Sequence, residues 1–305
     1  MKAYALGIYP RSPKLIEATR ANDPRLDNLF KTEKRKLIKL QIKSNMALVE
    51  DPMLDWNDIF RPFVNVKGIE LGALNRFFET NTFYRKLIIN DELKGYGKII
   101  KNNILLDELP ANKAVVMPDP YTFAELNENQ YYNSYEEYIL AIAKMLNKEA
   151  QTLAKEGVEF IQLNAPSIAY NANNIDDFSI IKESIEIVKK RVKSKIYLHL
   201  YFGNIEKILD KLLDIKIDGL SIDMINNSID AIKEYRFKGL GLGIIDATNT
   251  KLEDIKMAKD IEDRLNNMNY KEAYLCTNTD LEFLPYEFAT KKISRLAAIA
   301  KKVKI

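Results

Sequence analysis

The chain contains a single cysteine and a single histidine among its 305 residues. One cysteine excludes an internal disulfide bond, which suits a protein of the cytosol, where thiols stay reduced. The two residues together supply one thiol and one imidazole, and two such ligands are too few for zinc. A fold held together by disulfide bonds or by a structural zinc ion is therefore excluded.

Long hydrophobic runs and a surplus of one charge sign are absent as well. No apolar stretch approaches the roughly 18 residues that a membrane helix needs, and the first nine residues lack the features of a signal peptide. The net charge of +3 comes from 46 basic and 43 acidic side chains, so no polyanionic partner is implied. Residues 31–43 are rich in lysine, but their spacing is typical of the solvent-facing side of a helix. We expect a protein without membrane or nucleic-acid contacts, and its abundant lysine and glutamate suit a heat-tolerant one.

The apolar residues that are present make up 47% of the chain, which is enough for a large core. From residue 134 onward, amphipathic helices alternate with short apolar strands, a pattern typical of a parallel sheet. Ser134 and Glu137 form a capping box at the start of one long helix, and Gly157 suits its C-terminal cap. We predict strands at residues 3–9, 45–49, 113–117, 158–163, 196–201, 219–224, 239–246 and 273–277. We predict helices at residues 25–44, 134–157, 176–192, 205–214, 228–235, 252–268 and 286–302.

Eight parallel strands, with helices between them, predict a (β/α)8 TIM barrel that forms one domain over residues 1–305. Residues 50–112 are the one sizeable insertion, which follows the second strand, and we expect them to form a lid or an interface. No glycine-rich loop follows the first strand, and the glycines of Gly239–Gly243 lie inside a predicted strand. We interpret these glycines as sites of close backbone packing and do not predict a dinucleotide site.

The functional side chains of a barrel lie at the carboxyl ends of its strands. His199 and Tyr201 are two positions apart on one predicted strand and therefore point to the same side. If Asp223 and Cys276 also face inward, they can converge with His199 on a metal ion. The plainer alternatives are a hydrogen-bonded rim histidine, a cysteine that packs as a small hydrophobic residue, and an Asp246 that caps the following helix.

Several short segments, taken in chain order, carry a resemblance to a known family. They are Tyr9-Pro-Arg11, Arg76–Asn81, Pro120–Phe123, Ile161–Pro166, the His199 strand and Leu281–Pro285. Together they resemble the cobalamin-independent methionine synthases, zinc-dependent barrels that move a methyl group from methyltetrahydropteroylglutamate to homocysteine. The resemblance runs through nearly the whole chain and implies a barrel with a role in methionine biosynthesis.

The chain departs from the family's pattern at the metal. The zinc ligands of the family are a His-x-Cys pair, a glutamate and a later cysteine, and the matching positions here hold His199, Tyr201, Asp223 and Thr279. Tyrosine and threonine are poor replacements for thiolates, so the resemblance implies a degenerate zinc site and no cofactor in this chain.

The residues that handle the substrate in the family are changed too. The acidic pair that holds the homocysteine amine is replaced by Asn164-Ala165, and the proton-donating histidine is replaced by Thr248, on the loop that begins with Asp246. A threonine hydroxyl cannot donate a proton near neutral pH, so the catalytic residues stay unknown.

Larger members of the family contain two barrels, of which the amino-terminal one lacks the metal and helps to bind the folate. The resemblance therefore implies a free-standing support barrel that binds a methyltetrahydropterin or folate as methyl donor and works with a second, catalytic barrel. Its expected contacts to donor or substrate are Arg11, Arg76, Tyr121 and Asn164, with Lys14, Arg61 and Arg85 as further cations.

Two alternatives to the support barrel stay open. One is a self-sufficient homocysteine methyltransferase in which His199, Asp223 and Cys276 bind zinc. The other is a non-catalytic pterin-binding protein.

Overall fold

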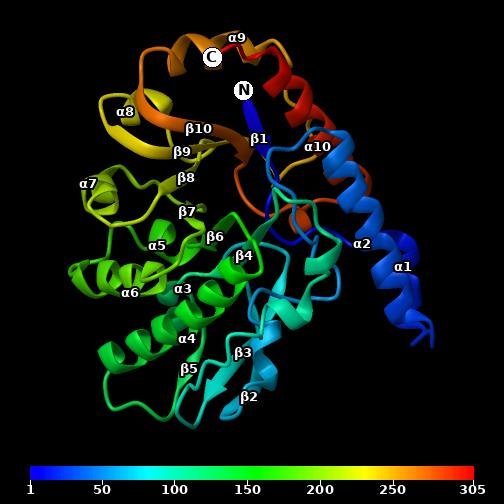
Figure 1. Cartoon of the computed structure of the whole chain (residues 1–305), viewed down its shortest axis with the longest axis vertical. Coiled ribbons are helices and arrows are strands. Elements are labelled where there is room, and N and C mark those ends of the chain that lie inside the picture. Colours follow the sequence, from blue (N-terminus) through cyan, green and yellow to red (C-terminus); the bar gives the residue numbers. More distant parts are fainter.

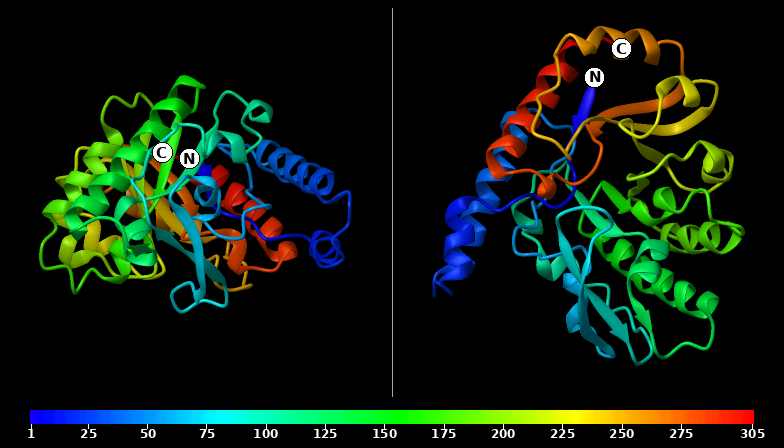
Figure 2. Two further views of the ribbon diagram at one scale, coloured as in Figure 1. Left: turned by 90° about the horizontal axis from the view of Figure 1, so that it is seen from below. Right: turned by 180° about the vertical axis from the view of Figure 1, so that it is seen from behind.

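A curled parallel sheet forms the centre of the computed structural model, which describes all residues from 1 to 305. Its seven strands pair in the order β1-β10-β9-β8-β7-β6-β4, and every pairing is parallel. Figures 1 and 2 show the strands curling around a common centre, with the helices on the outer side. The strands are β1 (Lys2–Tyr4), β4 (Ala114–Pro118), β6 (Phe160–Asn164), β7 (Lys195–Leu200), β8 (Gly219–Asp223), β9 (Arg236–Ile245) and β10 (Asn269–Thr277).

Ten α-helices and five short 3-10 helices connect or cover these strands. The α-helices are α1 (Pro13–Arg20), α2 (Leu26–Lys43), α3 (Pro120–Leu126), α4 (Tyr135–Lys155), α5 (Pro166–Tyr170), α6 (Ser179–Lys189), α7 (Leu209–Leu213), α8 (Ile229–Ile232), α9 (Met257–Leu265) and α10 (Tyr286–Lys302). The 3-10 helices are η1 (Arg61–Asn65), η2 (Lys101–Asn103), η3 (Leu106–Glu108), η4 (Glu206–Ile208) and η5 (Leu281–Phe283). No helix is both long enough and apolar enough to cross a bilayer.

The predicted ends of the long helix α4 are confirmed. The Ser134 hydroxyl accepts a hydrogen bond from the Glu137 backbone N–H (3.1 Å), and Gly157 has a φ of +82°. The Ser134 hydroxyl provides a partner for the Glu137 N–H, which has none inside the helix. The positive φ of Gly157 is a backbone conformation that glycine adopts without strain.

The segment predicted as the second strand, residues 45–49, is not a regular strand. Ala47 donates a backbone hydrogen bond to Ala3 (2.7 Å), and Val49 pairs with Lys113 next to β4, so the segment contacts both edge strands of the sheet. The ladder stops there because the Gln41 side chain bonds both the N–H and the C=O of Glu50, each at 3.0 Å. A side-chain amide thus takes the place that a neighbouring strand occupies in a regular ladder.

Residues 50–112 carry an antiparallel hairpin. Its strands are β2 (Ile69–Arg76) and β3 (Phe83–Ile89), and β3 also pairs with the two-residue strand β5 (Glu128–Asn129). The loop at 77–82 is the hairpin tip. The two views of Figure 2 show the hairpin projecting beside the curled sheet.

A buried ion pair attaches the start of this segment to α2. The Lys34 ammonium lies 3.1 Å from Asp51 and 2.6 Å from Asp55, and Lys34 and Asp51 are both almost fully buried. Removing one partner of such a pair leaves an uncompensated buried charge, so Lys34→Met is expected to lower the free energy of unfolding by about 3–5 kcal/mol. Urea denaturation measures this change. The matched control, Lys291→Met, breaks an exposed pair with Glu287 and is expected to cost below about 1 kcal/mol. Equal losses in both variants would contradict the assignment.

The glycines of β9 allow the inner side chains of the curled sheet to pack closely, as predicted. A Cβ atom at Gly239 would lie 1.7 Å from the Tyr197 hydroxyl oxygen, and one at Gly241 would lie 2.4 Å from the Ser221 hydroxyl oxygen. Tyr197 in turn donates a hydrogen bond to Glu272 (3.0 Å). The space beside β9 is therefore filled by neighbouring side chains, and the glycines serve packing.

Candidate functional site

His199 lies near the carboxyl end of β7, inside the curled sheet. It pairs in register with Asn164 on β6 and Ser221 on β8, and its ring centroid is 5.2 Å from that of Tyr201. Burial lowers the pKa of His199 to about 3, so the imidazole is neutral. Neither ring nitrogen makes a hydrogen bond of normal geometry, although the Asn278 backbone faces the ring and opposes the lowering of its pKa.

Asp223 and Cys276 lie on β8 and β10, on either side of Gly243 in β9. The Asp223 carboxylate already accepts hydrogen bonds from the Ile225 N–H (2.9 Å) and the Asn226 amide (2.6 Å). Burial raises the pKa of the Cys276 thiol to about 12, so this thiol is protonated near neutral pH. No three His, Cys, Asp or Glu side chains of the chain form a group that could hold a metal ion. As they lie in this structure, His199, Asp223 and Cys276 thus do not form a set of zinc ligands.

An acidic group that the sequence analysis did not single out lies at the same end of the sheet. Asp280 accepts a hydrogen bond from the Asn164 amide (2.9 Å), and Glu50 accepts one from the Gly7 N–H (2.6 Å). Burial raises the pKa of Asp280 to about 7 and that of Glu50 well above its usual range. Gly7, with a φ of +132°, is needed here because a Cβ atom would lie 2.1 Å from an Asp280 oxygen. Both carboxyl groups follow predicted strands by one to three residues, which was the available sequence signal.

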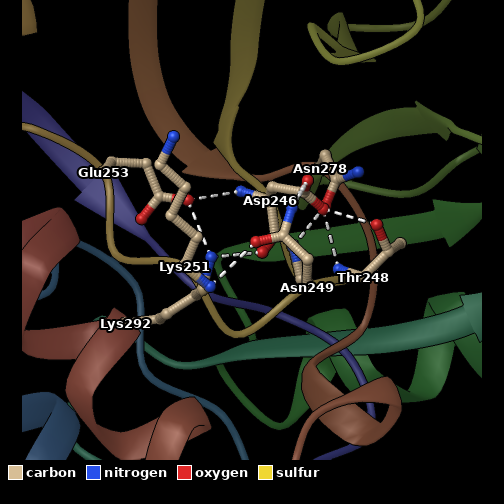
Figure 3. A network of polar contacts seen from close by, with 8 residues as sticks. Asp246, Thr248, Asn249, Lys251, Glu253, Asn278 and Lys292 are labelled. Carbon is tan, nitrogen blue, oxygen red and sulfur yellow. Dashed lines mark hydrogen bonds and ion pairs between the residues drawn. The ribbon is translucent and has the colours of Figure 1, made fainter.

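The loop after β9 is held rigidly (Figure 3). The Asp246 carboxylate accepts hydrogen bonds from the backbone N–H (2.8 Å) and the hydroxyl (2.6 Å) of Thr248, and from the Asn249 amide. The buried Lys292 ammonium bonds the Asp246 carbonyl and Glu253 (2.8 Å), and Glu253 also accepts the Asp246 N–H (2.9 Å). Since α9 begins only at Met257, Asp246 stabilises a turn and does not cap that helix.

A cavity of about 540 Å³, here called the mouth pocket, opens between the hairpin tip and the loops after the strands. Four of its lining residues are aromatic, and two carry carboxyl groups. They are Phe78, Tyr170, Phe202, Phe283, Glu79 and Glu282. The remaining lining residues are Thr80, Asn81, Thr82, Asn226 and Thr248.

Two strained aromatic residues join the hairpin tip to the curled sheet. Phe78 on the tip and Phe202 after β7 have φ values of 49° and 68°, and their ring centroids lie 5.5 Å apart. Phe202 also contacts Tyr201, with ring centroids 4.8 Å apart, and the Tyr201 ring is tilted by 44° against that of His199. Left-handed backbone is unusual for a bulky side chain and clusters at functional sites, which favours this end of the molecule as the site.

The four expected contacts to donor or substrate bond to different parts of the chain, and none of them lines the mouth pocket. The Arg11 guanidinium binds the Leu54 carbonyl (2.7 Å) and lies over the Phe30 ring. The Arg76 guanidinium binds the carbonyl of Thr80 in the hairpin turn (2.5 Å). The Tyr121 hydroxyl faces Asn171, the residue that directly follows α5, whereas the Asn164 amide bonds to Asp280 inside the sheet. Of the further cations, Arg61 pairs with Asp58 (2.8 Å).

A second cavity, of about 580 Å³, lies next to the mouth pocket and contains Arg11. We call it the arginine pocket. Trp56, Asn57 and Tyr286 also line it, and Glu282 lines both cavities.

The curled parallel sheet with its pocket at the carboxyl ends places the chain among α/β proteins of barrel type. Residues 67–269 match the family model described as "Cobalamin-independent synthase, N-terminal domain", and the chain belongs to this family. The methionine synthase of Thermococcus kodakarensis is 31% identical over 214 residues, which cover 69% of this chain and 60% of that protein. The methionine synthase of Sulfolobus acidocaldarius is 26% identical, over 94% of this chain and 88% of that protein.

The fold agrees with that of a solved structure. The putative vitamin-B12 independent methionine synthase from Listeria monocytogenes superposes with a TM-score of 0.78 at 15% identity, over 100% of this chain and 98% of that one. The resemblance predicted from the short segments is thereby confirmed at the level of the family and of the α/β fold.

Proposed function

We propose that this chain takes part in methyl transfer to homocysteine during methionine biosynthesis, as the subunit that binds the methyl donor and supports a second, zinc-bearing barrel. The observation that carries this proposal is the mouth pocket, an aromatic-walled cavity at the catalytic end of the fold, combined with side chains that do not fit zinc. Flat aromatic walls suit a pterin ring, which stacks on such side chains. The names of the relatives support the reaction, and the family model supports the comparison with an amino-terminal barrel.

We propose further that residues 1–305 form one (β/α)8 barrel, in which residues 45–49 take the place of the second strand. The hydrogen bonds from Ala47 to β1 and the pairing of Val49 beside β4 support this interpretation. Residues 50–112 then act as a lid, whose tip contributes Phe78 to the mouth pocket.

Mixing the purified chain with its catalytic counterpart tests the proposal. The rate of methionine formation is expected to rise with added chain and to level off at an equimolar ratio, because the donor is then bound across the two barrels. A counterpart that forms no complex with the chain and is not stimulated by it would contradict the supporting role.

Metal analysis separates this role from the self-sufficient zinc enzyme. The neutral, unpartnered His199 is the one observation that favours the latter. The supporting role predicts a chain purified without zinc, whereas about one zinc per chain, lost in His199→Ala, would establish the alternative. A chain that is thermally stabilised by methyltetrahydropterins, yet never stimulates a counterpart, would be the pterin-binding protein.

A further inference from the structure

Glu282 differs from the other polar groups of the mouth pocket because its carboxyl group makes no hydrogen bond or ion pair with the protein. Elsewhere in the pocket, the Thr248 hydroxyl donates to Asp246 (2.6 Å) and the Asn226 amide donates to Asp223 (2.6 Å). The second carboxyl group, that of Glu79, is exposed on the hairpin tip and accepts from the Tyr170 hydroxyl (3.4 Å). Glu282 is therefore the titratable group of the pocket that is free to act on a ligand.

Glu282 also stands between two cavities. It lies in the short helix η5 after β10 and lines both the mouth pocket and the arginine pocket. After Glu282 gives up its proton to a ligand in the mouth pocket, a new proton can reach it through the arginine pocket. This proton does not have to pass through the mouth pocket.

The surroundings of Glu282 favour its protonated form. Burial and the neighbouring carboxyl groups of Asp280 and Asp58 raise its pKa well above its usual range, and Arg11 opposes them. The charged groups that face Glu282 are Asp280 in the loop after β10, Asp58 before η1 and Arg11 in the loop after β1. A carboxylic acid in such a place can deliver a proton near neutral pH.

We propose that Glu282 is the acid of the mouth pocket, which gives a proton to the ring nitrogen of a methylated tetrahydropterin as its methyl group leaves. This inference rests on the proposed function. The bond from the methyl carbon to nitrogen breaks, and a bond from that carbon to the sulfur of a thiolate on the partner barrel forms. The electron pair of the broken bond stays on nitrogen and takes the Glu282 proton, which leaves a carboxylate that solvent protonates again. Glu282 thus supplies the proton that Thr248 cannot.

Binding of 5-methyltetrahydrofolate to the full chain tests this role without the partner. Calorimetry gives the Kd between pH 6 and pH 9 for the wild type, for Glu282→Gln and for the control Glu136→Gln, an exposed residue in the first turn of α4 that lines neither cavity. A protonated Glu282 donates a hydrogen bond to the ring nitrogen, and an amide donates at every pH. The wild type and E136Q are expected to lose about tenfold in affinity as pH rises, because one hydrogen bond is lost, while E282Q changes by less than about threefold.

Each other outcome overturns the inference in its own way. If E282Q binds far more weakly than the wild type at every pH, Glu282 acts as a carboxylate acceptor and not as an acid. If E282Q keeps the wild-type dependence on pH, another group carries the proton, and the donor-binding role survives. If neither protein binds the probe at millimolar concentration, the proposed function fails and this inference fails with it.

Discussion

Asp280→Asn is expected to make the protein more stable than the wild type by about 2–4 kcal/mol at pH 7.5 and to leave stability unchanged at pH 4. Burial raises the pKa of Asp280 to about 7, whereas the unfolded chain has its ordinary value near 4. The folded state therefore holds a proton that the unfolded state releases, and stability is lost as pH rises from about 4 to about 7. Asparagine has nearly the same shape, has no charge to lose, and can still accept the hydrogen bond from Asn164.

Urea denaturation at both pH values measures this difference directly. The control, Asp263→Asn, changes an exposed residue of α9 and is expected to follow the wild type at both pH values. A stabilisation that is the same at pH 4 and at pH 7.5 would mean that the charge of Asp280 is not its cause.

The double variant Tyr201→Cys, Thr279→Cys is expected to bind about one zinc ion per chain, which the wild type is not expected to hold. His199 and Tyr201 share one side of β7, and the His199 ring faces the backbone of Asn278, one residue before Thr279. The Thr279 hydroxyl is buried and has no partner. Two thiolates beside a neutral imidazole form a ligand set that zinc accepts, because the thiolates neutralise its charge.

Zinc content after dialysis, measured by atomic emission, checks this prediction. Each single variant supplies one thiolate fewer and is expected to lose its metal on dialysis. In a second control, Thr279→Cys is replaced by Thr290→Cys, which lies on α10 outside the sheet. A folded double variant without zinc would show that positions 201 and 279 do not converge.

Much of the fold could be predicted because its signals are local. The alternation of apolar residues predicts β6 and β7 to within two residues at each end, and Ser134, Glu137 and Gly157 predict both ends of α4. Each of these signals depends on neighbours a few positions apart along the chain. The segment 45–49 was predicted as a strand by the same reasoning, and the contact of Gln41 with Glu50 shows why it is not a regular one.

The candidate site was only partly predictable. The rule that function lies at the carboxyl ends of strands led to His199, Asp223 and Thr248, and Thr248 does line the mouth pocket. The rule could not place Arg11, Arg76, Tyr121 and Asn164 relative to one another, and in the structure each of them bonds to a different partner.

The sequence by itself determined the resemblance to the family and the alternation of strands and helices, because each of these is written in the residue types and their order. The tertiary structure alone decided which side chains meet. Phe78 lies against Phe202, Asn164 bonds to Asp280, and Glu282 stands between two cavities. The two residues of each contact, Phe78 with Phe202 and Asn164 with Asp280, are separated by about 115 or more positions in the sequence. Such distant pairs form because packing the helices and strands together excludes water and fills space, and no local sequence pattern contains this information.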